Sequence, residues 1–305
     1  MTADDIKRVL IIGSGNMGQQ IGFLCATNGF ETVLFDTNPD VLSEAVSRTL
    51  KLSKRYIADG RMTEEEAEAA LDRISVTNTP EEAAKGVDLI SESVPENPEL
   101  KGNVFGMFNN LCPKHTIFTT NTSTLVPSMF ADATGRPDKF AALHFHDVRI
   151  TNIVDIMPHP GTSNKTIKII KDFTKKIGQL AIVLQKENNG YVFNNMFSSL
   201  CAAALTMAEK EVASIEDIDR SWMGIMHTLV GPFGIMDQIG LKTIHTVTDY
   251  WAQKKNDPQG KANAAFVKQM IDKGYLGAQT KRGFYTYPDP AYLQPGFLKG
   301  QTDKP

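Results

Sequence analysis

A histidine and an aspartate lie in two short apolar segments near the middle of the chain, at residues 140–144 and 153–157. His144 ends the first segment, and the ordinary pKa of an imidazole near neutral pH suits a group that moves protons. Asp155 lies inside the second segment, where a carboxylate is costly unless it is paired. A histidine partner would satisfy Asp155 and orient the imidazole ring. The sequence therefore predicts a proton-transferring pair; the alternative is an aspartate held by backbone N–H groups.

A polar segment follows another apolar run. Asn121-Thr-Ser-Thr-Leu125 comes directly after residues 117–120, and ligands bind beyond the carboxyl ends of strands in open sheets. Ser123 can therefore direct its hydroxyl group toward a substrate. The alternative is a turn or capping role, which is common for serine and threonine after a strand.

A second histidine, His146, lies two residues beyond His144, so the two imidazoles would share one face of a strand. With Asp147 nearby, a metal site is conceivable, because histidine and carboxylate groups bind metal ions. No third ligand is evident in the sequence, and we predict no metal.

A glycine-rich loop near the N-terminus could bind phosphate. Gly13-Ser-Gly15-Asn-Met-Gly18 has the spacing G-x-G-x-x-G, follows apolar residues 8–12 and opens a helical pattern. The first glycine allows a tight turn, the second admits a pyrophosphate, and the third lets helix and strand pack closely. Asn16 and Met17, between the last two glycines, are also expected to contact the cofactor, and the N-terminus of the helix that follows offers N–H groups to phosphates. The alternative is a glycine turn in an unrelated α/β protein.

An acidic residue supports the interpretation of this loop as a dinucleotide site. Asp36 ends the second apolar segment, 18 residues beyond Gly18. A carboxylate at this point accepts hydrogen bonds from ribose hydroxyl groups and repels a 2′-phosphate. We therefore predict NAD, rather than NADP, as the cofactor.

These candidate residues depend on short apolar segments that alternate with helical patterns. Such an alternation favours a parallel sheet covered on both faces. Strands are expected at residues 8–12, 32–35, 74–77, 89–92, 117–120, 140–145, 153–157 and 181–184, and helices at 19–28, 41–57 and from Thr63 onward. We predict an α/β Rossmann-type domain over residues 1–186, with a mostly parallel, doubly wound sheet.

The pattern changes after Leu184. The polar stretch 185–190 ends in glycine and resembles a linker, and strand signals fade beyond it. Residues 191–211 carry apolar side chains at helical spacing, and Ser214 begins a capping-box pattern. We predict an all-α second domain over residues 187–305, with a disordered tail from residue 300.

The composition excludes several classes of protein. The 305 residues include 32 basic and 35 acidic side chains, for a net charge of −3, without the basic excess that nucleic-acid binding needs. We expect no signal peptide and no membrane span, because the apolar runs are short. The three cysteines, Cys25, Cys112 and Cys201, have neither disulfide nor metal-ligand spacing. We predict a cytoplasmic protein with neither nucleic acid nor membrane as a partner.

Together these motifs resemble the 3-hydroxyacyl-CoA dehydrogenase family over nearly the whole chain. The glycine-rich loop is similar to the family's dinucleotide loop, and residues 88–101 resemble its I-E-x-V-P-E-x-x-x-x-K segment. Asn121-Thr-Ser-Thr-Leu125 resembles N-T-S-S-L, and His144 matches the histidine of H-F-F-N-P. Residues 190–194, 231–241 and 276–287 resemble G-F-V-x-N-R, G-P-F-E-L-x-D-x-x-G-L and L-G-R-K-x-G-x-G-F-Y-x-Y.

The resemblance implies an NAD-dependent, reversible oxidation of a short-chain 3-hydroxyacyl-CoA such as 3-hydroxybutyryl-CoA. It implies that His144 is the catalytic base, and that Asp155 replaces the glutamate that orients it. Ser123 and Asn194 would contact the substrate. Cofactor contacts are implied for three further residues: Glu96, Lys101 and Asn121. We also expect a site between the two domains, and a homodimer formed through the helical domain.

A CoA substrate would need cations for its phosphate groups. Lys51, Lys54 and Arg55 lie on the helix expected after Asp36, and this spacing places them on one helical face. The alternative is a solvated basic face without a ligand.

The chain departs from the family pattern around the substrate. The segment H-F-F-N-P is His144-Phe-His-Asp-Val148 here, the orienting glutamate is the shorter Asp155, and Asn195 replaces an arginine. An alternative substrate is therefore a free 3-hydroxy acid, because residues 157–162 also resemble the lambda-crystallin and L-gulonate 3-dehydrogenase branch, and carnitine dehydrogenase is related. A third possibility is an NAD-binding protein without turnover, as in the crystallin relatives.

Overall fold

The structure is a computed structural model that describes residues 1–300, and its chain forms two compact units, Met1–Val192 and Phe193–Pro305. The sequence predicts a domain boundary after Lys186, whereas the two units meet after Val192. The tail that the sequence predicts to be disordered lies, from residue 301 onward, outside the described residues. Within residues 1–300, no helix combines the length and the apolar character needed to cross a bilayer.

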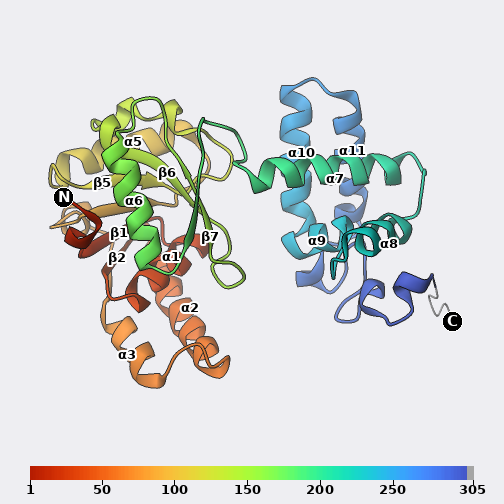
Figure 1. Cartoon of the computed structure of the whole chain (residues 1–305), viewed down its shortest axis with the longest axis horizontal. Coiled ribbons are helices and arrows are strands. Elements are labelled where there is room, and N and C mark those ends of the chain that lie inside the picture. The colour runs from red at the N-terminus through yellow and green to blue at the C-terminus, as the bar shows by residue number, and fades with distance from the viewer. Residues whose placement is uncertain (301–305) are drawn as a thin grey trace. The chain divides into compact units, whose positions relative to one another are not determined.

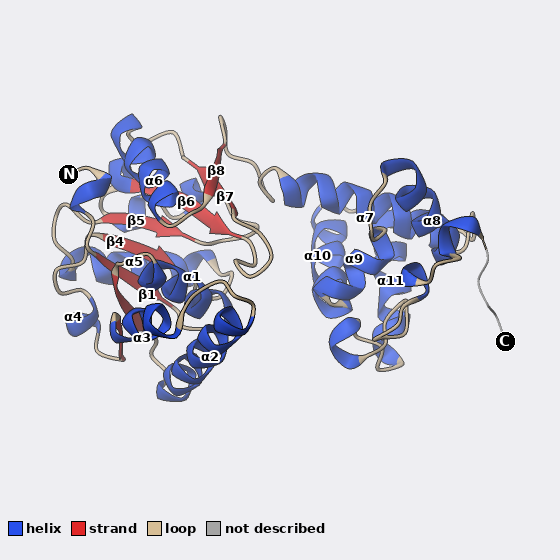
Figure 2. Ribbon diagram, turned by 60° about the horizontal axis from the view of Figure 1, so that its bottom comes forward, coloured by secondary structure: helices blue, strands red, loops and turns tan. Residues whose placement is uncertain are grey.

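The first unit is built on one eight-stranded sheet with the order β3-β2-β1-β4-β5-β6-β7-β8 (Figure 2). The strands are β1 Arg8–Ile12, β2 Glu31–Phe35, β3 Ile74–Thr77, β4 Leu89–Glu92, β5 Ile117–Thr120, β6 Phe140–Phe145, β7 Ile153–Met157 and β8 Leu180–Val183. β6 and β7 are antiparallel, and the other neighbouring strands are parallel. The predicted mostly parallel sheet is confirmed.

Six α-helices flank this sheet. They are α1 Asn16–Thr27, α2 Pro39–Ala58, α3 Glu64–Asp72, α4 Pro80–Ala83, α5 Pro98–Leu111 and α6 Asn164–Lys176. Several begin where the sequence supplies a cap: Asn38 accepts from the N–H of Asp40, and Thr63 and Glu66 form the predicted capping box.

The two faces of the sheet are buried by different helices, because successive strand residues point in opposite directions. Val9 and Ile11 of β1 pack in one core, with side chains of α1, α2 and α6. Leu10 and Ile12 pack in the other core, with side chains of α4 and α5. The strands therefore read as continuous apolar runs in the sequence.

The antiparallel pair β6–β7 has a simple cause. Only residues 146–152 connect the two strands, which is too short for the crossover that a parallel pair needs. Asp147 turns the chain there: its carbonyl accepts from the N–H of Ile150 at 3.0 Å. This hairpin sets His144 directly opposite Asp155 in the register.

The second unit is helical and has its own core. Its helices are α7 Phe193–Glu209, α8 Ile215–Met226, α9 Pro232–Ile239, α10 Leu241–Lys254 and α11 Pro258–Asp272. α11 packs against both α7 and α10 (Figure 1). Ser214 caps α8, as the sequence predicts, by accepting from the N–H of Asp217. The prediction of an all-α second domain is confirmed.

The three cysteines of the chain, Cys25, Cys112 and Cys201, are free and buried.

Candidate active site

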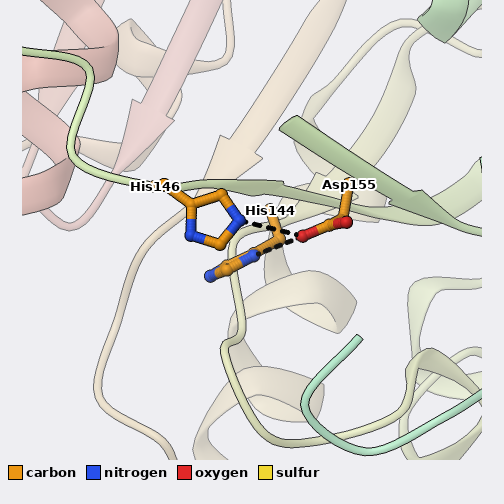
Figure 3. A group of neighbouring side chains, drawn as sticks. All are labelled: His144, His146 and Asp155. Atoms are coloured by element: carbon orange, nitrogen blue, oxygen red, sulfur yellow. Dashed lines mark hydrogen bonds and ion pairs between the residues drawn. The ribbon is translucent and has the colours of Figure 1, made fainter. Parts of the chain in front are cut away.

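The predicted pair of His144 and Asp155 is brought together by the β6–β7 register. Nδ1 of His144 lies 3.2 Å from Oδ2 of Asp155 (Figure 3). Both residues are buried, with 3% and 1% of their surfaces exposed. The shorter aspartate therefore reaches the imidazole without a longer side chain, because the two residues are direct partners across the hairpin.

His146 is a second partner of the same carboxylate. Its Nε2 lies 3.1 Å from Oδ2 of Asp155, and its ring stands edge-on to that of His144, with centroids 4.7 Å apart (Figure 3). The sequence predicts that the two histidines share one face of a strand, whereas β6 ends at Phe145; their shared contact with Asp155 was not predicted. His146 lies just beyond Phe145, the last residue of β6, and two residues from the register partner of Asp155.

The electrostatics of the cluster favour a neutral His144 and an ionised Asp155. Burial lowers the pKa of His144, against the raising effect of the hydrogen bond with Asp155. Burial alone would raise the pKa of Asp155, but the hydrogen bonds from His144 and His146 outweigh it, and its pKa lies below the ordinary value. An ionised carboxylate accepts only, so Nδ1 of His144 carries the proton and Nε2 keeps its lone pair.

Tyr191 fixes the plane of the His144 ring. The two rings stack with centroids 4.5 Å apart and an interplanar angle of 13°. The tyrosine is 1% exposed, and its hydroxyl donates to the carbonyl oxygen of Thr122 at 2.6 Å. Tyr191 therefore ties the loop that holds Ser123 to the imidazole. Sequence reasoning did not assign this residue, because nothing in a pattern shows that a residue far along the chain stacks on His144.

Ser123 is held by a carboxylate at its backbone. Oε1 of Glu96 accepts from the N–H of Ser123 at 2.5 Å, and both carboxylate oxygens accept from the hydroxyl of Thr122, at 2.9 and 2.7 Å. The Ser123 side chain itself is half-buried. Glu96 thus shapes the loop, and its predicted contact with a cofactor stays a prediction.

Lys101 lies in a buried ion pair behind this loop. Its ammonium donates to Oε1 of Glu92 at 2.7 Å and to the carbonyl of Val94 at 3.0 Å, and lies 3.5 Å from Glu96. The residue is 1% exposed. These contacts support the loop that holds Ser123, and the predicted cofactor contact of Lys101 stays a prediction.

Asn121 links the ends of two strands. Its Oδ1 accepts from the N–H of Phe145 at 2.7 Å, which joins the residue after β5 to the last residue of β6. His144 precedes Phe145, so this hydrogen bond also steadies the base. The predicted cofactor contact of Asn121 stays a prediction.

The glycine-rich loop has the shape that a dinucleotide requires. Gly13 has a φ of +90°, and a Cβ on Gly18 would collide with the carbonyl oxygen of Gly13. A Cβ on Gly15 would meet nothing within 4 Å, so this glycine borders open space at the start of α1. Asn16 and Met17 form the first turn of that helix.

Asp36 is tied to the same loop. Its Oδ2 accepts from the N–H of Ser14 at 3.0 Å, and its Oδ1 from the N–H of Asn38 at 3.0 Å. The Oγ atoms of Ser14 and Ser93 are buried without a partner among the described residues. Polar groups left in this state mark a place for a bound polar ligand, so the residues present fit a dinucleotide.

A cationic pocket lies where α2 faces the start of α1. Four of its lining residues are positively charged: Arg48, Lys51, Arg55 and Arg149. The cavity is about 260 Å³. Of the three cations that the sequence places on one face, Lys51 and Arg55 line this pocket; Lys54 is exposed on α2 and is not among the lining residues, and its contact with a phosphate stays a prediction. Lys51 and Arg55 are one helical turn apart, so both can reach the same cavity.

Asn194 belongs to the second unit, where it is the second residue of α7 and half-buried. Its contact with substrate stays a prediction.

Comparisons with known proteins agree with this geometry. Residues 8–188 match the family model "3-hydroxyacyl-CoA dehydrogenase, NAD binding domain", and residues 190–287 match "3-hydroxyacyl-CoA dehydrogenase, C-terminal domain". The rat mitochondrial hydroxyacyl-coenzyme A dehydrogenase is 30% identical, over 92% of this chain and 91% of the relative.

Solved structures agree too. A diketoreductase structure, described as showing dual catalysis of dicarbonyl compounds, is 35% identical with a TM-score of 0.87, over 92% of this chain and 99% of the other. The (S)-3-hydroxybutyryl-CoA dehydrogenase of Ralstonia eutropha is 28% identical with a TM-score of 0.83, over 93% of this chain and 100% of the other.

Proposed function

Because the chain belongs to the 3-hydroxyacyl-CoA dehydrogenase family, we propose that it interconverts a short-chain 3-hydroxyacyl-CoA and the 3-ketoacyl-CoA with NAD. The observation that carries the proposal is the buried pair of His144 and Asp155, which leaves Nε2 of the imidazole as a proton acceptor. NAD, when bound, supplies the hydride acceptor. Gly13, Gly15 and Gly18 would hold its diphosphate, and Asp36 its ribose.

The base is His144 in this proposal. In the oxidation, Nε2 takes the proton of the substrate's 3-hydroxyl group, and the ring becomes an imidazolium. Asp155 stabilises that charge and fixes the tautomer, while it stays ionised itself. Tyr191 holds the ring plane, so little reorientation is needed before the proton moves.

Two polar residues would position the substrate. We assign to Ser123 and Asn194 the hydrogen bonds to the reacting oxygen or the neighbouring carbonyl. Correct orientation of the reactants can lower the barrier by several kcal/mol. Glu96 supports Ser123 through its backbone N–H, so loss of Glu96 should disturb the substrate contact indirectly.

The cationic pocket supports a CoA ester as the substrate. Lys51 and Arg55 lie with Arg48 and Arg149 around a cavity beside α1, and guanidinium and ammonium groups bind phosphate. The double variant Lys51→Ala/Arg55→Ala should raise the KM for acetoacetyl-CoA about tenfold or more, because each charge-assisted hydrogen bond contributes roughly 1.5–3 kcal/mol. Lys54→Ala is the matched control on the same helix, and its KM should not change.

A second candidate is reduction of a dicarbonyl compound or 3-keto acid without CoA. The similarity to the diketoreductase, at 35% identity, favours this candidate, together with the change of H-F-F-N-P to His144-Phe-His-Asp-Val148. Loss of NADH absorbance should be followed with acetoacetyl-CoA, dehydrocarnitine, free 3-keto acids and a simple diketone. Oxidation of NADH by the CoA ester supports the first proposal, and oxidation by the small ketones alone supports the second.

The homodimer and the cytoplasmic location remain predictions. Light scattering of the purified protein tests the first, and fractionation of the source cells tests the second.

A further inference from the structure

Three potential metal ligands converge at the proposed base. His144, His146 and Asp155 each offer one ligand atom, and these atoms lie within 4.8 Å of one another (Figure 3). Nδ1 of His144 and Nε2 of His146 both approach the same carboxylate oxygen, at 3.2 and 3.1 Å. The carboxylate that joins the two histidines is Asp155, not the Asp147 that the sequence places nearby, which pairs with Arg149.

The spacing suits a transition metal ion. Ligands bound at about 2.0–2.1 Å around a tetrahedral centre lie roughly 3.3 Å from one another. The two nitrogen–oxygen distances are already close to that value, so chelation requires the two imidazole nitrogens to approach each other. The set of two imidazoles and one carboxylate favours Zn²⁺, Co²⁺, Ni²⁺ and Cu²⁺ over Mg²⁺ and Ca²⁺, which prefer oxygen ligands.

His146 is more exposed to solvent than the other two candidate ligands. His144 and Asp155 are almost fully buried, and the stacked ring of Tyr191 restrains the former. The side chain of His146 is 18% exposed, and it lies beyond the end of β6. An ion could therefore reach the cluster from the side of His146, the most exposed of the three side chains.

We propose that His144, His146 and Asp155 form a binding site for Zn²⁺ or a similar divalent transition metal ion, and that occupancy of this site switches off proton transfer at His144. The inhibitory part rests on the proposed function, because it requires His144 to be the base. The site itself does not depend on that function.

The inhibition follows from the tautomers of imidazole. A metal bound at Nδ1 takes the lone pair of that atom, so the single proton of the neutral ring must lie at Nε2. The proton moves from Nδ1 to Nε2 through solvent, and no redox change occurs. Nε2 then donates and cannot accept the hydroxyl proton of a substrate. The metal also occupies Oδ2 of Asp155, which otherwise stabilises the imidazolium.

The second histidine distinguishes this chain from the family pattern. His146 stands where H-F-F-N-P has its second phenylalanine, so His146→Phe restores the family residue and removes one ligand. His115→Phe is the matched control: it removes a histidine that also contacts an aspartate, Nε2 to Oδ1 of Asp88 at 2.8 Å, far from this cluster in the sheet.

The test uses Co²⁺ as a spectroscopic probe and Zn²⁺ as the inhibitor, on protein freed of metal by a chelator. We expect one Co²⁺ per chain with visible absorption of a four- or five-coordinate ion. His146→Phe should weaken Co²⁺ binding at least tenfold, while His115→Phe leaves it unchanged. Zn²⁺ should inhibit wild-type turnover, and the inhibition, measured against each variant's own rate in chelator, should weaken in His146→Phe.

Four results separate the two claims. Absence of Co²⁺ absorption in the wild type, or equal binding by His146→Phe, overturns the site. Binding that follows this pattern, with turnover insensitive to Zn²⁺, overturns the switch. If Co²⁺ binds to the wild type and more weakly to His146→Phe, but the protein turns over no ketone, the metal site is supported and the proposed function is contradicted. If His146→Phe does not fold, His146→Gln provides the same loss of an imidazole ligand.

Discussion

Asp155 in the first unit and Asp219 in the second are buried to almost the same extent, at 1% and 0% exposure, yet their partners differ in kind. Asp155 meets two imidazoles, His144 and His146. Asp219 of α8 accepts instead from the backbone N–H groups of Phe233 and Gly234, at 2.9 and 3.0 Å.

A tyrosine hydroxyl completes the surroundings of Asp219, since Tyr285 donates to it at 3.0 Å. Asp237 of α9 repeats the arrangement: it accepts from the N–H groups of Phe284 and Tyr285 and from the hydroxyl of Tyr287. These two carboxylates hold the start of α9 and the segment after α11 in place.

The partners determine what each carboxylate can do. Backbone N–H groups and tyrosine hydroxyls keep their protons at neutral pH, so Asp219 and Asp237 serve the architecture. Imidazoles exchange protons near neutral pH, so Asp155 can support chemistry. Two equally buried carboxylates can therefore have different roles, which their hydrogen-bond partners determine.

The pKa values move in opposite directions accordingly. Burial raises the pKa of Asp219 to about 6, although its hydrogen bonds oppose the rise. Burial also raises the pKa of Asp237. The pKa of Asp155 is lowered, because its two imidazole partners outweigh its burial.

Asp155→Asn should produce the largest effect on turnover. The amide keeps the size of the side chain, but it supplies no charge to stabilise the imidazolium, and it permits the wrong tautomer of His144. We expect kcat to fall about 10²- to 10⁴-fold, as measured by NADH absorbance at saturating ketone. A kcat within threefold of wild type would contradict the catalytic role that distinguishes Asp155 from Asp219.

Asp219→Asn should affect stability rather than turnover. One amide oxygen cannot accept from all three donors, and the new NH₂ group faces N–H groups. The free energy of unfolding should fall by about 2–4 kcal/mol, measured by urea denaturation. Turnover per folded molecule should stay at the wild-type value, and a loss of kcat as large as that of Asp155→Asn would contradict the comparison.

Tyr191→Leu tests whether ring stacking positions the base. Loss of the stack frees the His144 ring, and we expect kcat to fall about tenfold, because aromatic pairs contribute roughly 0.5–1.5 kcal/mol. Tyr191→Phe keeps the stack and loses only the hydrogen bond to Thr122, so its kcat should fall less. A role in packing alone predicts losses of stability in both variants with kcat unchanged.

The smallest predicted effect is a pH dependence of opposite sign in the two units. Asp219 has a raised pKa when folded, so its contribution to stability grows as the pH falls below about 6. His144 has a lowered pKa when folded, so its contribution is lost as the pH falls below the ordinary imidazole value. The change at Asp219 between pH 7 and pH 5 is on the order of 1 kcal/mol.

Amide hydrogen exchange at pH 7 and pH 5, corrected for the intrinsic exchange rate, measures both units in one sample. Protection should rise in α9 and fall in β6 as the pH is lowered. A change of the same sign in both elements would show that these two groups do not control local stability.

Whether the sequence could predict a feature of this site depends on how far apart along the chain the contacting residues lie. His144 and Asp155 were predictable as a pair because an isolated carboxylate in an apolar strand needs a partner, and a short connection makes a hairpin. The glycine-rich loop and Asp36 were predictable because local spacing alone defines them.

The remaining features depend on tertiary structure. Tyr191 stacks on His144 from the end of the first unit, and His146 shares Asp155 with His144. Lys101 shows the limit most clearly: the family resemblance implies a cofactor contact for it, but no pattern in the sequence shows that it pairs with Glu92 in the interior. Spacing does not reveal such a partner.

The most direct test of the central claim is the turnover of acetoacetyl-CoA by His144→Ala, with NADH binding measured in parallel by fluorescence. The account predicts rapid oxidation of NADH by the wild type, a loss of about 10²- to 10⁴-fold in the variant, and unchanged affinity for NADH. Turnover by His144→Ala at the wild-type rate would contradict the assignment of the base.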